Sequence, residues 1–319
     1  MILDAMDALI RKAAFDHLAW LRERDGDVLT RKALSVGFEF RGERINLLSP
    51  ARGIFKPRQL AMPLSIATTV NSPYNDSLGD GDVLRYAYCG TNPNQVDNAG
   101  LRQAMRTRTP LVYFHSVVQS RYLAVWPVYV VNDRPDLLMF DIQVDDRSSL
   151  SLERPEGMYP DDDADLPIRR RYATVATRTR LFQQTFRERV LAAYRQECTL
   201  CRLKHVTLLE AAHIVPDSEA LGEPRVPNGL SLCKIHHAAF DQGILGINPD
   251  GRAEVRLDIL DEVDGPMLKH GIQAMHHVKI RLPSRFEARP DREALAWRYE
   301  RFRKASGPRS HSDNPDRQR

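Results

Sequence analysis

The sequence predicts an α+β protein with two parts, and three observations lead to that expectation. The chain has 319 residues, which is long enough for two domains of ordinary size. Its first half contains many short runs of β-branched and aromatic residues between turn residues. Its second half contains a long helical stretch and two closely spaced pairs of cysteine or histidine. Hydrophobic residues make up 42% of the chain and charged residues 28%, which excludes a wholly disordered or fibrous protein.

The first part, residues 1–150, is expected to form a small barrel-like domain. Apolar residues at helical spacing predict one helix over residues 2–24 and a short one over Leu101–Arg108. The strand-like runs cover residues 36–40, 83–88, 111–114 and 122–131. Many short strands with one or two helices are typical of a curved, barrel-like sheet.

A linker is predicted over residues 151–177, because the run Glu153–Asp165 combines prolines, a glycine and several aspartates. The second domain, residues 178–305, is expected to open with a long helix over Arg178–Arg195. The tail, residues 306–319, has no apolar side chain to bury and is expected to be disordered.

The end of the second domain is expected to alternate strands with one helix. Strands are predicted over residues 255–260, 264–268 and 278–282. A closing amphipathic helix is predicted over residues 291–304, with Asp291 at its N-cap.

Positive charge is concentrated in one segment of the chain. Residues 1–150 hold 18 basic and 17 acidic side chains, whereas residues 168–205 hold ten basic and two acidic ones. Such a segment attracts polyanions, and guanidinium groups suit phosphate oxygens. We therefore expect contacts to a nucleic-acid backbone from Arg178, Arg180 and Arg187. The alternative is a solvated, arginine-rich helix face.

The composition also predicts the compartment. No stretch approaches the roughly 18 apolar residues of a membrane span, and the first twelve residues have the reverse charge order of a secretory signal. Four cysteines are too few for a disulfide framework in a chain of this length. We expect a cytoplasmic protein with no membrane partner.

Three of the four cysteines fall into a metal-binding pattern. The pairs Cys198-x2-Cys201 and Cys233-x2-His236 can each present two ligands from one tight turn, as a tetrahedral Zn²⁺ ion requires. The alternatives are buried thiols beside a chance histidine, or a redox pair, although no βαβ pattern surrounds the first pair. The spacing predicts a structural zinc site, and Cys89 is left over as a core thiol.

The residues between and after these pairs resemble a known family. His213, Asn228 and His237 follow one another in the order and spacing of the HNH nucleases of the ββα-metal class, bracketed by the two zinc pairs. The resemblance covers about residues 195–250. It implies a ββα fold and metal-dependent hydrolysis of phosphodiester bonds in DNA.

The resemblance implies a role for each of these residues. His213 would act as general base on a water molecule, and Asn228 would hold the loop that carries it. His237 and Asp241, spaced four residues apart on a helix, would share one catalytic ion, Mg²⁺ or another divalent cation. Many HNH enzymes have a metal ligand directly before the general base, where this sequence has Ala212, and Glu210 would need an altered path to replace it.

The arrangement of a barrel-like domain before an HNH module is similar to the modification-dependent, type IV-like restriction endonucleases. Their reader domain is SRA/PUA-like and flips a modified cytosine, 5-methyl or 5-hydroxymethyl, out of the duplex. By that resemblance Tyr74, Tyr86 and Tyr88 would stack on the base, and Asp76 would accept from its amine. Half-buried strand packing is the alternative for each tyrosine.

The sequence thus predicts an endonuclease that restricts double-stranded DNA carrying modified cytosine. A homodimer is expected, because cutting both strands needs two active sites. Two alternatives remain open at this point. The substrate could be unmodified or otherwise modified DNA, or the protein could be a zinc-stabilised DNA-binding protein that does not cut.

Overall fold

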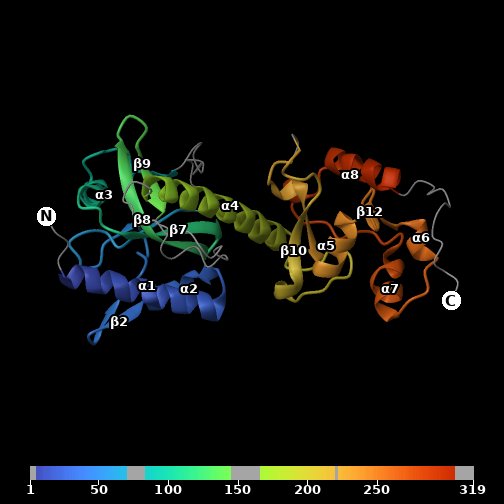
Figure 1. Cartoon of the computed structure of the whole chain (residues 1–319), viewed down its shortest axis with the longest axis horizontal. Helices are drawn as coiled ribbons and strands as arrows, with labels where there is room; N and C mark the ends of the chain where they lie inside the picture. The colour runs from blue at the N-terminus through green and yellow to red at the C-terminus, as the bar shows by residue number, and fades with distance from the viewer. Residues whose placement is uncertain (1–4, 70–82, 145–165, 220–221, 306–319) are drawn as a thin grey trace. The chain divides into compact units, whose positions relative to one another are not determined.

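The computed structural model describes residues 5–69, 83–144, 166–219 and 222–305 (Figure 1). The chain divides into two compact units, residues 1–182 and residues 183–319. Both contain helices and strands, so the α+β class expected from the sequence is confirmed. In the part of the chain that the structure describes, no helix is long and apolar enough to cross a membrane.

The first unit is built on a curved half-barrel sheet of seven strands, in the order β4-β5-β7-β8-β9-β6 with β1 paired to β8. All pairs are antiparallel except β5 with β7. The strands of this sheet are β1 Val28–Thr30, β4 Ile54–Phe55, β5 Ser65–Ala67, β6 Leu84–Ala87, β7 Leu111–Val118, β8 Arg121–Arg134 and β9 Met139–Val144. The remaining elements are α1 Ala5–Asp25, α2 Arg31–Val36, the hairpin β2 Phe38–Phe40 with β3 Glu43–Ile45, and α3 Val96–Arg106.

Strand β7 shows why this sheet is covered on both faces. Val112 and Phe114 point into a core shared with α1, whereas Leu111 and Tyr113 point into a second core shared with α3 and the middle of α4. Successive side chains of a strand alternate between faces, so a strand buried on both sides is apolar without interruption. The short helix and the strand-like runs predicted for this part correspond to α3 and to β2, β6, β7 and β8.

Helix α4, Leu166–Ala193, begins earlier than the helix predicted at Arg178. Residues 166–177, which the sequence assigned to the linker, are therefore helical. The side chain of Thr174 shows one reason, because its hydroxyl donates to the Arg170 carbonyl and accepts from the Val144 amide, which ties the early turns to strand β9. The acidic run 153–165 and the tail 306–319 lie outside the described residues.

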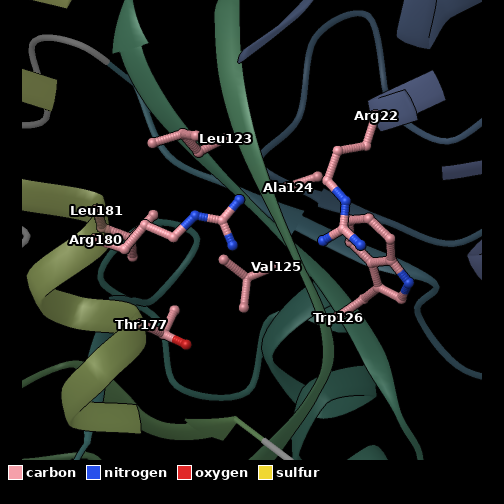
Figure 2. Close-up of a pocket in the computed structure, with 8 residues that line it drawn as sticks. All are labelled: Arg22, Leu123, Ala124, Val125, Trp126, Thr177, Arg180 and Leu181. Atoms are coloured by element: carbon pink, nitrogen blue, oxygen red, sulfur yellow. The ribbon is translucent and has the colours of Figure 1, made fainter. Parts of the chain in front are cut away.

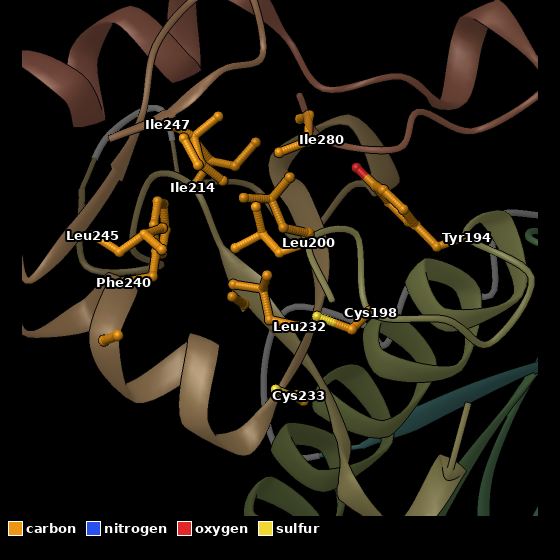
Figure 3. Close-up of a cluster of buried hydrophobic side chains, with 14 of the residues drawn as sticks. Tyr194, Cys198, Leu200, Ile214, Leu232, Cys233, Phe240, Leu245, Ile247 and Ile280 are labelled. Atoms are coloured by element: carbon orange, nitrogen blue, oxygen red, sulfur yellow. The ribbon is translucent and has the colours of Figure 1, made fainter. Parts of the chain in front are cut away.

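The second unit places a ββα motif around a single apolar core. Hairpin β10 Leu209–His213 and β11 Gly229–Cys233 is followed directly by helix α5 Lys234–Asp241. Figure 3 shows the core beneath it, to which Tyr194, directly after α4, contributes together with Leu232, Phe240 and Ile280. The other elements are β12 Leu245–Ile247, β13 Ala253–Val255, α6 Leu257–Leu260, α7 Pro266–Gly271 and α8 Arg292–Ala305.

None of the three strands predicted near the end of the chain forms as predicted. Strand β13 ends at Val255, and residues 257–260 form α6 instead of continuing it. Residues 266–271 form α7, with Pro266 in its first turn, where the fixed φ and missing N–H of proline suit a helix. The run 278–282 makes only an isolated bridge, from Lys279 to Arg252. Helix α8 does form, and the Asp291 carboxylate accepts from the amides of Glu293 and Ala294 as an N-cap.

Candidate active site and metal centre

The two predicted ligand pairs come together in a cluster suited to a tetrahedral metal ion. The ligand atoms of Cys198, Cys201, Cys233 and His236 all lie within 4.8 Å of one another. Nδ1 of His236 is 3.4 Å from the Cys198 sulfur and 3.2 Å from the Cys233 sulfur, and the sulfurs of Cys201 and Cys233 are 3.9 Å apart. Zn–S bonds of about 2.3 Å in a tetrahedron put sulfur atoms about 3.8 Å apart, so these edges fit zinc.

A hydrogen bond outside the cluster orients the histidine ligand. Nε2 of His236 lies 2.7 Å from the carbonyl oxygen of Gly271, to which it donates. The proton on Nε2 leaves the lone pair of Nδ1 directed at the three sulfurs, which is the arrangement that metal-bound histidines need. The cluster could therefore hold Zn²⁺ without rearrangement of its side chains.

The other candidate residues lie in the ββα motif, whose second strand and helix also carry Cys233 and His236. In the hairpin, His213 at the end of β10 lies opposite Gly229 at the start of β11. A Cβ at Gly229 would lie 2.4 Å from Val190 and 2.9 Å from Phe186, both on α4. Glycine at this position therefore allows α4 to approach the hairpin closely.

That close approach fixes the ring of His213. Phe186 stacks on it with ring centroids 4.1 Å apart and an interplanar angle of 9°. About a quarter of the His213 side chain remains exposed, at 26%. Its Nε2 lies 3.3 Å from the Asp217 carboxylate, is shielded from solvent, and makes no hydrogen bond among the described residues. A water molecule would reach this unpaired nitrogen only after a neighbouring side chain moves.

The electrostatic setting of His213 favours the neutral ring. Burial lowers the pKa of His213 below its ordinary value of 6.5, and the charge of His237 lowers it further, while Asp217 and Asp241 oppose both effects. At neutral pH the imidazole is therefore unprotonated and able to accept a proton, as a general base must.

Asn228 is buried and joins the two arms of the hairpin loop. Its Oδ1 accepts from the Val215 amide at 2.9 Å, and its Nδ2 donates to the carbonyls of Val215 at 2.9 Å and Glu223 at 3.1 Å. The backbone carbonyl of Asn228 accepts from the Ile214 amide. These bonds hold the segment that directly follows His213, so Asn228 can position the base without touching a substrate.

His237 lies between two carboxylates. Its Nδ1 is 2.7 Å from Oε2 of Glu210, and its Nε2 is 3.2 Å from Oδ2 of Asp241. The sequence left Glu210 without a clear part, but the structure brings it to His237 because β10 packs against α5. Arg298, from α8, completes the group by donating to Oδ1 of Asp241 at 3.0 Å.

The charges of this group indicate that it attracts a cation. The hydrogen bond to Asp241 and the second one to Glu210 raise the pKa of His237, and the same contact with His237 lowers the pKa of Asp241. The two carboxylates therefore stabilise a positive charge at the imidazole. A divalent cation that replaces the proton on Nε2 would meet one nitrogen and one carboxylate oxygen, which is a suitable donor pair for Mg²⁺ or a transition metal.

The structure describes two of the four predicted base-pocket residues. Tyr74 and Asp76 lie outside the described residues. The rings of Tyr86 and Tyr88 are buried in the core of the sheet, with only 6% and 5% of each residue exposed. The Tyr86 hydroxyl donates to the Ala67 carbonyl, and that of Tyr88 donates to Asp133. These contacts favour the packing role that the sequence left open for each tyrosine.

The three predicted backbone-contact arginines differ in their surroundings. Arg180 extends from α4 over strand β8 towards Val125 (Figure 2) and pairs with Asp27 at 2.6 Å. Arg187 donates to the carbonyls of Val206 and Leu209 and pairs with Glu188, so it braces the start of β10. Arg178 is half-buried.

Comparison with known proteins agrees with this geometry. Residues 198–248 match the family model described as HNH endonuclease, and the match spans the zinc cluster and the whole ββα motif. This segment is therefore an HNH endonuclease domain, and the enzyme class predicted from the sequence, a DNA endonuclease, is confirmed. No curated protein matches the chain.

Two solved structures show a distant likeness. The first is titled "Modification dependent TagI restriction endonuclease", with 17% identity, a TM-score of 0.29, and coverage of 75% of this chain and 81% of that one. The second is the "Type IV phosphorothioation-dependent restriction endonuclease ScoMcrA", with 14% identity, a TM-score of 0.25, and coverage of 86% and 71%. Both TM-scores lie below 0.5, so neither likeness establishes a shared fold, and the SRA/PUA-like identity of the first unit stays a prediction.

Proposed function

We propose that the protein is a metal-dependent endonuclease that cuts double-stranded DNA containing modified cytosine, 5-methyl or 5-hydroxymethyl, and so restricts foreign DNA. In this proposal the second unit carries out hydrolysis and the first unit reads the modification. The observation that best supports hydrolysis is the pairing of a neutral, partly exposed His213 with the cation-attracting group Glu210, His237 and Asp241.

Each candidate site residue of the second unit has one task in this proposed reaction. His213 takes a proton from the attacking water, and Phe186 and Asn228 hold the ring and the loop in place. His237 and Asp241 would hold the catalytic divalent ion, which would supply stabilisation of the charge on the phosphate and on the leaving oxygen. Zn²⁺ in the Cys198 cluster has a structural role only.

The assignment of a modified base as the recognised feature rests on the sequence pattern of residues 35–145. It is tested with duplexes of one sequence that carry cytosine, 5-methylcytosine, 5-hydroxymethylcytosine or a phosphorothioate linkage. We expect cleavage of one or both of the cytosine-modified duplexes, in Mg²⁺ or Mn²⁺ and not in EDTA. Equal cleavage of all four duplexes would contradict the assignment of the first unit as a reader of modified cytosine. Cleavage of the phosphorothioate duplex alone would show that the recognised modification is in the DNA backbone and not on the base.

Cleavage of both strands requires two HNH sites, so we propose that a homodimer acts on the DNA. A supercoiled plasmid that contains modified cytosine distinguishes a dimer, which cuts both strands together, from a monomer, which cuts one strand at a time. Direct appearance of the linear form supports a dimer, whereas nicked circles that accumulate at every protein concentration contradict it. A protein that binds the modified duplex tightly but leaves it intact in every metal would instead be a zinc-stabilised DNA-binding protein.

A further inference from the structure

Helix α8 lies outside the segment that matches the HNH family, yet it borders the candidate active site. It packs on strand β12, where Gly246 permits close contact, because a Cβ there would lie 2.5 Å from the ring of Phe302. Between α8 and the end of α5 a cavity of about 240 Å³ remains. A single water needs only about 10–15 Å³ in comparable terms, so a phosphate group has room there.

The wall of this cavity combines one residue of the metal site with two arginines. Asp241 contributes from α5, Arg298 and Arg301 contribute from α8, and the remaining lining is apolar or glycine apart from the neutral polar Gln242. The lining itself carries two guanidinium groups and one carboxylate, and Glu219, outside the lining, pairs with Arg301. The guanidinium donors suit an oxyanion such as a phosphate.

Arg298 reaches Asp241 and still has donors to spare. Its side chain is only 16% exposed, and its guanidinium lies 4.6 Å from the centre of the Phe240 ring. The hydrogen bonds that it makes to the Phe240 carbonyl and to Asp241 both use Nη2. Nε and Nη1 make no hydrogen bond to a described residue, which leaves one edge of the guanidinium for an oxygen acceptor.

Arg301 lies one helical turn further along and is held in place on two sides. Its guanidinium lies 3.7 Å from the centre of the Trp297 ring, and Nη2 contacts Glu219 at 3.0 Å. The side chain is 54% exposed, so it can meet a ligand without burial of the ion pair. A guanidinium positioned in advance loses less side-chain entropy on binding a phosphate.

We propose that this cavity binds a backbone phosphate of the substrate strand, next to the phosphate that is cut. The proposal rests on the proposed function, because it places that phosphate beside the ion held by Asp241. Arg298 joins the two sites, since one of its nitrogens holds the Asp241 carboxylate while its free edge donates to the phosphate. Arg301 supplies the second guanidinium, as arginine pairs do in phosphate recognition.

The test compares Arg301→Gln with Arg303→Gln, a matched loss of charge on the same helix. Arg303 is exposed and does not line the cavity. DNA binding is measured by fluorescence anisotropy in Ca²⁺, with duplexes in which one phosphate at a time is replaced by a neutral methylphosphonate. We expect one position near the cut where neutralisation weakens binding by the parent about tenfold. In Arg301→Gln that position should lose its effect, while every other position keeps its effect.

Salt dependence gives a second readout. Loss of one phosphate contact reduces the slope of log Kd against log salt by about 0.9. Arg301→Gln should show that reduction, and Arg301→Lys should recover part of the affinity, because lysine keeps the charge without the fork. Unchanged melting temperatures would show that each variant is folded.

Either of two results would overturn the inference. Arg301→Gln could behave as Arg303→Gln does, or it could weaken binding equally for every methylphosphonate position. Both results leave the proposed cleavage intact, since cleavage by the parent is measured separately in Mg²⁺. The opposite outcome is also distinguishable. If the parent never cuts DNA but Arg301→Gln loses one phosphate contact relative to the parent, the proposed nuclease activity is contradicted and the proposed phosphate site is retained.

Discussion

Replacement of Asn228 tests whether its buried amide holds the loop that carries His213. Asn228→Ala removes one acceptor and two donors, and it leaves the amide and carbonyl of Val215 and the carbonyl of Glu223 without their partner. Each such bond contributes about 1 kcal/mol net, so the variant should lose about 3 kcal/mol of unfolding free energy. At 2–4 °C per kcal/mol the transition of the second unit should fall by roughly 6–12 °C.

Asn228→Asp sharpens this test because the shape of the side chain is unchanged. The carboxylate can still accept from the Val215 amide, but it now faces two carbonyl oxygens to which the amide had donated. We expect a loss of stability at least as large as in Asn228→Ala. If the loop moves by about 1 Å, cleavage should slow on the order of a hundredfold.

The measurements are calorimetric melting and single-turnover cleavage at saturating metal. Metal binding at His237 should be unaffected, because Asn228 does not touch that group. If Asn228→Asp melted and cut as the parent does, the amide would have no part in holding the loop, and the positioning role would be refuted.

Three further changes test other parts of the site. Glu210→Gln weakens the hydrogen bond that orients His237, so the divalent ion concentration for half-maximal cleavage should rise about 10–100-fold, and an unchanged value would contradict that role. Cys201→Ser removes one exposed ligand, so the zinc content per chain should fall well below one and the melting temperature should drop. The control Cys89→Ser should keep the parental zinc content and melting temperature. Equal zinc content in the two variants would exclude the cluster as the zinc site. Because burial lowers the pKa of His213 and the neutral ring is the active form, cleavage at saturating metal should fall on the acid side with a midpoint below 6.5, and a midpoint above 6.5 would exclude His213 as the titrating base.

The local parts of the fold could be predicted because their signals lie within a few residues. Helix α8 has its N-cap at Asp291 as the sequence indicates, and the two ligand pairs of the zinc cluster are each three residues apart. Residues 257–260 could not be assigned in the same way, because a short apolar run fits a strand or a helix equally well. In the structure this run is helical, and Ile259 packs into the core of the second unit.

The parts of the site that the sequence did not reveal depend on tertiary contacts. Glu210 and His237 are 27 residues apart, and Arg298 is 57 residues from Asp241, so no spacing rule connects them. Phe186 falls within the long helix predicted from the sequence, and its stacking on His213 depends on Gly229, which lets that helix approach. A sequence reveals which residues can do chemistry more readily than it reveals which residues orient them.

In the proposed mechanism His213 activates water beside a cation held by His237 and Asp241. The most direct test is single-turnover cleavage of modified DNA in Mg²⁺ by His213→Ala, with His205→Ala, an exposed histidine outside the site, as the matched control. We predict that His213→Ala still binds DNA and zinc but cuts at least a hundredfold more slowly, in line with the loss of a general base, while His205→Ala cuts as the parent does. Cleavage by His213→Ala at the parental rate would contradict the mechanism.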